Sequence, residues 1–97
     1  MSKKRAYRSK MRILADMMRT IQREGEEGAG PTKILYAANL SHDRLTQYLD
    51  ELMEKGLIRI ENAESDSRVY LLTEKGRAFL REFIRIERFS EAFGIEV

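Results

Sequence analysis

The chain has 97 residues and a formal net charge of +2; 42% of the residues are hydrophobic, 35% are charged, and cysteine is absent. This length allows one domain with one modest core, and the lack of cysteine excludes a disulfide framework and a thiolate zinc site. No apolar run in the sequence approaches the roughly 18 residues that a membrane span needs, and the basic N-terminus leads into an amphipathic segment instead of a signal-peptide core. We therefore expect a soluble, cytoplasmic protein with no membrane partner.

The first twelve residues form a predicted basic arm, 1–12. Six of the 18 basic residues and none of the 16 acidic ones lie in it, which leaves 12 basic and 16 acidic residues, a net charge of −4, for the rest of the chain. Such an arm either neutralises phosphates and releases counterions or only keeps a terminus soluble. Its candidates for phosphate contact are Lys3, Lys4, Arg5 and Arg8.

Apolar residues recur at steps of three and four from about Ser9 to Arg23, which predicts an amphipathic first helix. The segment 25–31 then gathers three Gly and the only Pro, which predicts a mobile loop. Its spacing lacks the ending of a P-loop, and Glu26 and Glu27 would repel a phosphate, so a phosphate-binding loop is not expected.

A helix-turn-helix is predicted over 31–56, and its first helix is short. Pro31 presets φ for a first helical turn, and Thr32 can accept a backbone N–H, so we expect a helix over Lys33–Ala38. Its inward-facing residues are predicted to be Ile34, Leu35 and Ala38.

The second helix of the motif follows a turn at Asn39, a residue that tolerates a left-handed backbone. Ser41 is a good N-cap for a helix through Lys55. Gly56 is expected to end that helix, because the residue after the last helical turn often needs a positive φ. The buried stripe of this helix is predicted to comprise Leu45, Leu49, Leu52 and Met53.

A β-hairpin, the wing, is predicted over 57–72. Leu57–Ile60 and Arg68–Leu72 are rich in β-branched and aromatic residues, and the turn-forming segment Asn62–Ser67 separates them. The predicted fold is therefore mainly α with a small β-hairpin: a winged helix-turn-helix domain over 9–73, followed by a C-terminal dimerisation helix.

The last helix is predicted within 73–97, capped by Thr73 and ending near Phe93, with Gly76 in the first turn where its low propensity costs least. All four Phe of the chain lie on it. Steps of four, three, four and three, typical of a heptad seam, connect Phe79, Phe83, Ile86, Ser90 and Phe93, and the seam is widened by Leu80, Ile84 and Phe89. The helix either folds entirely onto its own core or packs partly against a second copy. We favour the homodimer, because exposed Phe side chains would each forgo roughly 1.5 to 3 kcal/mol. The predicted interface comprises Phe83, Ile86, Phe89 and Phe93.

Catalytic chemistry finds little support in the sequence. There is one His, no Cys, and no motif that would assemble a nucleophile with its base, so we expect no enzymatic activity. His42 has no second ligand at helical spacing, so no metal site is expected. Nothing in the sequence indicates another cofactor or a small-molecule ligand.

A helix-turn-helix most often binds double-stranded DNA, with the N-terminal turns of its second helix in the major groove. Arg can contact guanine with two hydrogen bonds and Gln can do the same with adenine, so the candidates for base contact are Arg44, Gln47 and His42. Tyr48 is expected to pack rather than to contact the DNA backbone. Besides the arm, the candidates for phosphate contact are Lys33, Ser41, Thr46, Arg59 and Arg68.

The run 33–41, Lys-Ile-Leu-Tyr-Ala-Ala-Asn-Leu-Ser, together with Tyr48, Leu52-Met53 and the run 70–76, resembles the small archaeal winged-helix chromosomal DNA-binding proteins. The similarity covers roughly 31–80. Its helix-turn-helix part is fairly specific, whereas the Leu-Thr-x-Lys-Gly ending is shared by many winged-helix families. The resemblance implies a nucleoid-associated homodimer, joined by an antiparallel coiled coil of the last helices, that binds duplex DNA as a chromatin or transcription factor.

This chain departs from that pattern in two respects. Its last helix ends by Val97, which shortens the coiled coil, and its wing carries Glu61, Glu64 and Asp66 where a nonspecific DNA coater would be basic. A transcriptional regulator is therefore favoured over a nonspecific chromatin-organising protein. The same mixed surface also suits a winged-helix protein-interaction module, which is the alternative function.

Overall fold

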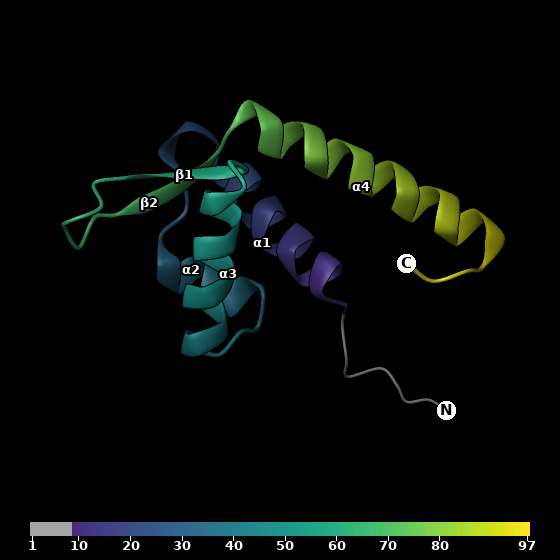
Figure 1. Ribbon diagram of the computed structural model, residues 1–97, viewed down its shortest axis with the longest axis horizontal. Coiled ribbons are helices and arrows are strands. Elements are labelled where there is room, and N and C mark those ends of the chain that lie inside the picture. Colours follow the sequence, from purple (N-terminus) through teal and green to yellow (C-terminus); the bar gives the residue numbers. More distant parts are fainter. Residues whose placement is uncertain (1–8) are drawn as a thin grey trace.

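The computed structural model describes residues 9–97 (Figure 1). The elements follow in this order: α1 (Lys10–Glu24), the 3-10 turn η1 (Gly25–Glu27), α2 (Pro31–Ala37), α3 (His42–Glu54), β1 (Ile58–Glu61), β2 (Val69–Leu72) and α4 (Glu74–Phe93). The predicted fold class, mainly α with a small hairpin and a C-terminal helix, is confirmed. The side chains predicted to form the arm before residue 9, Lys3, Lys4, Arg5 and Arg8, lie outside the described residues.

Helix α1 begins one residue after its N-cap, Ser9, whose hydroxyl accepts a hydrogen bond from the Arg12 backbone N–H at 3.1 Å. The predicted arm, 1–12, therefore overlaps the start of this helix. Lys10 pairs with Glu51 at 2.9 Å, and Arg12 pairs with Glu87 at 2.7 Å. These two cations therefore pair with carboxylates of α3 and α4 and belong to the predicted first helix, which overlaps the predicted arm.

The segment between α1 and α2 is tied to the wing. The Ala29 N–H donates to the Tyr70 carbonyl at 3.0 Å, and the Tyr70 N–H donates to the Ala29 carbonyl at 2.8 Å. Gly28 permits this approach, because at its φ of +76° a Cβ would lie 2.9 Å from the Tyr70 carbonyl oxygen. The prediction of a mobile loop is therefore wrong for Ala29, which is buried against β2.

Helix α2 begins two residues earlier than predicted. Gly30 is its N-cap, Pro31 occupies the first helical turn, and no side chain caps the helix, so the expected role of Thr32 is wrong. Ile34 and Ala38 face the core as predicted, and Leu35 is half-buried. Asn39 makes the turn at a φ of +55°.

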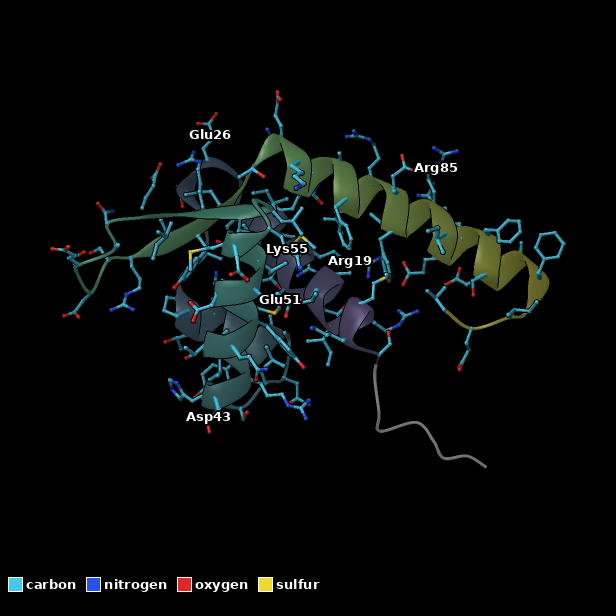
Figure 2. The ribbon with its side chains drawn as sticks, in the orientation of Figure 1. Arg19, Glu26, Asp43, Glu51, Lys55 and Arg85 are labelled. Carbon is cyan, nitrogen blue, oxygen red and sulfur yellow. The ribbon has the colours of Figure 1, made fainter. Side chains whose placement is uncertain are left out.

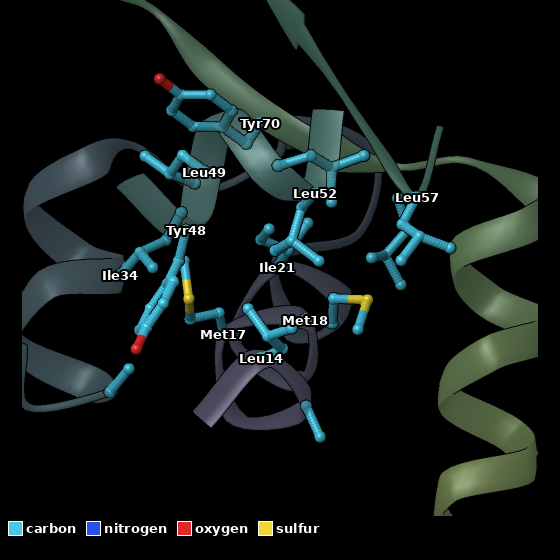
Figure 3. Packing of buried hydrophobic residues seen from close by; sticks show 14 of the residues in the cluster. Leu14, Met17, Met18, Ile21, Ile34, Tyr48, Leu49, Leu52, Leu57 and Tyr70 are labelled. Carbon is cyan, nitrogen blue, oxygen red and sulfur yellow. The ribbon is translucent and has the colours of Figure 1, made fainter. Parts of the chain in front are cut away.

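The core lies around α1, which is buried by the helix-turn-helix, the hairpin and α4 (Figure 3). In Figure 3, Met17 of α1 lies beside Tyr48 of α3, Ile21 lies next to Leu52 of α3, and Met18 lies on the side of Leu57 at the start of the wing. The largest fully buried side chains of the core are Phe83, Met17, Met18, Ile21, Ile34, Leu52 and Leu80. One continuous core therefore joins α1, α2, α3 and α4.

The hairpin pairs β1 with β2 antiparallel, with Ile58 opposite Leu72 and Glu61 opposite Val69. Its turn begins at Asn62, which has a φ of +56°. The wing was thus predicted to within a residue at each strand end. Its tip extends away from the helices in Figure 1.

Helix α4 begins at the predicted cap, where the Thr73 hydroxyl accepts from the Gly76 N–H at 3.0 Å. Gly76 has a stronger reason to be glycine than its place in the first turn, because a Cβ there would lie 2.0 Å from the Leu57 carbonyl oxygen. The start of α4 thus packs directly on the backbone where α3 gives way to β1. The far end of α4 extends past α1 on the side opposite the wing (Figure 1).

Replacing Gly76 with Ala tests this close packing. In an ordinary helix Gly→Ala stabilises by up to about 1 kcal/mol, but here we expect a loss of about 1 to 3 kcal/mol in the free energy of unfolding because backbone must move. Urea denaturation followed by circular dichroism measures the change. The control is Gly94→Ala, which meets no atom within 4 Å and bears only the strain of its left-handed backbone. A stabilised Gly76→Ala variant would contradict the packing argument.

Candidate nucleic-acid interface

The N-terminal turns of α3 are exposed apart from the side chains that pack on the core. Ser41 caps the helix by accepting from the Arg44 N–H at 3.2 Å, and Leu45, Tyr48, Leu49 and Leu52 seat it on the core. Tyr48 therefore packs, as predicted. Figure 2 shows Asp43 at the end of α3 that lies farthest from the wing. The exposed residues around this end are Ser41, His42, Asp43, Arg44, Thr46 and Gln47.

Arg44 and Gln47, which are predicted to contact bases, lie three residues apart and so share one face of α3. Among residues 9–97, no hydrogen bond or ion pair engages the side chain of either residue. Both side chains are thus ready to bind a partner from outside the chain. His42 is exposed two residues before Arg44, beside the cap.

The other candidate cations differ in how free they are. Lys33 pairs with Glu24 at 3.2 Å, and Arg59 pairs with Glu61 at 2.6 Å. Arg68 is exposed, and no described group binds its guanidinium. Because exposed ion pairs contribute about 0 to 1 kcal/mol, Lys33 and Arg59 can exchange their carboxylates for phosphates at little cost.

Acidic side chains border this surface. Glu61, Glu64 and Asp66 are exposed on the wing, and Asp50 and Glu54 are exposed on the second half of α3. Among the described residues of α3 and the wing, the cationic side chains without a described partner are Arg44, Lys55 and Arg68, and Lys55 lies beside Asp50 and Glu54 at the far end of α3.

The exposed apolar face of α4 comprises Ile86, Phe89 and Phe93. These side chains are 50%, 66% and 66% exposed, and the two phenyl rings lie 4.8 Å apart between centroids. Ile95, which the sequence analysis did not single out, is also exposed beyond the helix. Phe83, by contrast, is buried in the core of its own chain. Its assignment to a dimer interface is therefore corrected, because a second copy cannot reach it.

An ion cluster missed by sequence reasoning surrounds Phe83. Glu87 of α4 accepts hydrogen bonds from Arg12, at 2.7 Å, and from Arg19, and both guanidinium carbons lie 5.9 Å from the centre of the Phe83 ring. Figure 2 shows Arg19 between α1 and α4. Burial alone would raise the pKa of Glu87, but the hydrogen bonds from Arg19 and Arg12 outweigh it and lower the pKa below its ordinary value.

Residues 9–97 contain neither a cluster of metal-ligating side chains nor a membrane-spanning helix. No group of three or more His, Asp or Glu side chains gathers there in a way that would hold a metal ion. None of the helices in that range is both long enough and apolar enough to cross a membrane.

The family model described as winged helix-turn-helix matches residues 7–91. The chain belongs to this family. Among solved structures, this winged helix-turn-helix chain is similar to Sso10a-2, described as a DNA-binding protein from Sulfolobus solfataricus, with 30% sequence identity, a TM-score of 0.69 and 90% of each chain covered. No curated protein matches the chain. The predicted resemblance to small archaeal winged-helix DNA-binding proteins is thereby confirmed.

The Glu87 cluster gives this winged helix-turn-helix chain a defined response to acid. Because the folded state lowers the pKa of Glu87, its stabilising contribution is complete above the ordinary glutamate value of 4.5 and is lost as pH falls through the folded value. Unfolding free energies measured from neutral to acid pH should fall more steeply in the wild type than in Glu87→Gln. The control is Glu91→Gln, an exposed acid one turn later. Parallel curves for wild type and Glu87→Gln would contradict this expectation.

Proposed function

We propose that this chain binds double-stranded DNA by placing the first turns of α3 in the major groove. The observation that carries the proposal is the exposed N-terminal face of α3, where Arg44 and Gln47 have no partner within the described chain. Membership of the winged helix-turn-helix family supports it, as does the similarity to a DNA-binding protein with the same fold. In this motif the second helix is the element that enters the groove.

The proposed contacts divide into base reading and phosphate binding. Arg44 donates to guanine and Gln47 bonds adenine, and His42 is exposed in the same first turn of α3 as Arg44. Ser41 and Thr46, also exposed, lie where backbone oxygens pass. The remaining proposed phosphate ligands are Lys3, Lys4, Arg5, Arg8, Lys33, Arg59 and Arg68.

A sequence-selective transcriptional regulator fits this surface better than a nonspecific chromatin protein. Nonspecific affinity depends on many phosphate contacts, but Glu61, Glu64 and Asp66 place negative charge along the wing, which would otherwise lie against DNA. Binding must then rely on a few contacts at the first turns of α3. The proposal assigns the protein to the nucleoid and gives it no catalytic role.

We further propose that the protein acts as a homodimer through α4. Ile86, Phe89 and Phe93 form an apolar face that the chain's own core leaves exposed. Burying such a face against the same face of a second copy gains roughly 25 cal/mol for each Å² of apolar surface. A two-fold dimer would present two α3 helices to one duplex.

The DNA proposal is tested by gel-shift titration over salt. The probes are a duplex recovered by pull-down from fragmented genomic DNA and a scrambled duplex of equal length. Arg44→Ala should weaken binding by about 1 to 3 kcal/mol on the recovered duplex only. Lys4→Ala combined with Arg5→Ala should weaken both alike and reduce the salt slope by about 2.

The matched control is Arg85→Ala, which removes the same charge from an exposed position on α4. Equal losses on both duplexes from Arg44→Ala would contradict base reading. Undetectable binding of the wild type to either duplex at moderate salt would overturn DNA binding and favour the protein-interaction module.

Sedimentation tests the dimer. The wild type should sediment with twice the chain mass, and Phe89→Ser combined with Phe93→Ser should give a monomer, because the exposed apolar face of α4 is lost. Tyr36→Ser is the control, since it removes an aromatic side chain of similar exposure from α2. A wild type that stays monomeric at every concentration would refute the dimer.

A further inference from the structure

Helix α4 has two faces with different tasks. Phe83 and Glu87, four residues apart, face α1, and the apolar face at Ile86, Phe89 and Phe93 points away from the core. From residue 88 onward the side chains are exposed, apart from half-buried Ser90. Glu87 is therefore the last side chain of α4 with a described ion pair to α1.

The ion cluster of Glu87, Arg12 and Arg19 restricts movement of α4 relative to α1. Both oxygens of Glu87 are engaged, one by Arg12 and the other by Arg19, and Arg19 also lies 3.8 Å from Asp16. The Glu87 side chain is only 15% exposed. Charge-assisted hydrogen bonds from two directions fix a carboxylate more firmly than a single exposed pair does. Rotation of α4 about the Phe83 contact would break at least one of them.

Helix α1 also packs against α2, the first helix of the helix-turn-helix, and α2 in turn packs against α3. Leu45, Leu49 and Leu52 of α3 belong to the core cluster that includes Met17 and Met18 of α1. The orientations of both α3 and α4 therefore depend on packing against the same core around α1. Holding α4 rigidly to α1 holds its exposed apolar face at a set angle to the DNA-facing end of α3.

We propose that the Arg12–Glu87–Arg19 cluster is a positioning joint that fixes the angle between α3 and the apolar face of α4, and so sets the spacing at which two copies present their α3 helices to one duplex. This inference rests on the proposed dimer and DNA binding for its consequence, but the joint itself is a property of one chain. A merely stabilising cluster would raise the unfolding free energy without selecting a spacing.

The joint is tested inside one chain by distances between spin labels. Because the wild type lacks cysteine, Glu54→Cys on α3 and Arg88→Cys on α4 accept labels at those two sites alone. Mixing labelled protein with excess unlabelled protein restricts the signal to distances within a chain. The expected result is one narrow distance distribution in the labelled parent.

Adding Glu87→Gln should at least double the width of that distribution, whereas adding Glu91→Gln should leave it unchanged. Arg12→Gln keeps the contact between Arg19 and Glu87 and should give an intermediate width. If Glu87→Gln fails to fold, the width for Arg12→Gln is compared with that of the parent instead. Equal widths in the parent and in a folded Glu87→Gln variant would overturn the joint.

The effect of the joint on the spacing of the two α3 helices is tested by measuring affinity for duplexes from about one to about three helical turns long. Wild-type affinity should rise on the order of 100-fold at the length where both α3 helices can bind. Glu87→Gln should match the wild type on the shortest duplex but lose about tenfold of that rise. An equal rise in both proteins would overturn the spacing role. Absence of wild-type binding at every length would instead refute the proposed function, and the spin-label distances would still decide the joint.

Discussion

The arrangement of the whole chain depends on the burial of α1 from several sides. Met17, Met18 and Ile21 of α1 belong to the core that also includes residues of α3 and the start of the wing. Phe83 of α4 belongs to the same core and lies against Arg19 of α1. A helix that packs against several elements cannot shift without disturbing each of them, because protein interiors are close-packed. Packing around α1 therefore sets the orientation of the exposed ends of α3 and α4, which carry the proposed contacts.

Local chemistry was enough to predict most elements. Ser41 and Thr73 form the expected N-caps, and Asn39 takes the expected left-handed turn. What the sequence could not supply was contact between distant segments. Ala29 pairs with Tyr70, and Gly76 closely approaches Leu57, so each contact joins residues about 20 to 40 positions apart in the sequence. Periodicity and capping patterns cover only neighbouring residues and cannot predict such contacts.

The same limit applies to the candidate site. Exposure of Arg44 and Gln47 follows from the helical period, and sequence analysis therefore placed them on the outer face of α3. It could not tell which Phe of α4 would be buried, because the heptad spacing treats Phe83 and Phe93 alike. Nor could it find Arg12, Arg19 and Glu87, since charges at wide separation in sequence give no sign that they meet.

The pairing of Ala29 with Tyr70 also affects how the molecule meets its own copies. An isolated two-stranded hairpin has two open edges, and an open edge is a template for strand addition by another chain. Here the outer edge of β2 is blocked at Tyr70 by backbone from the segment before α2. Sheet extension and aggregation through β2 are thereby disfavoured, so that among the described strands only the outer edge of β1 remains open to strand addition.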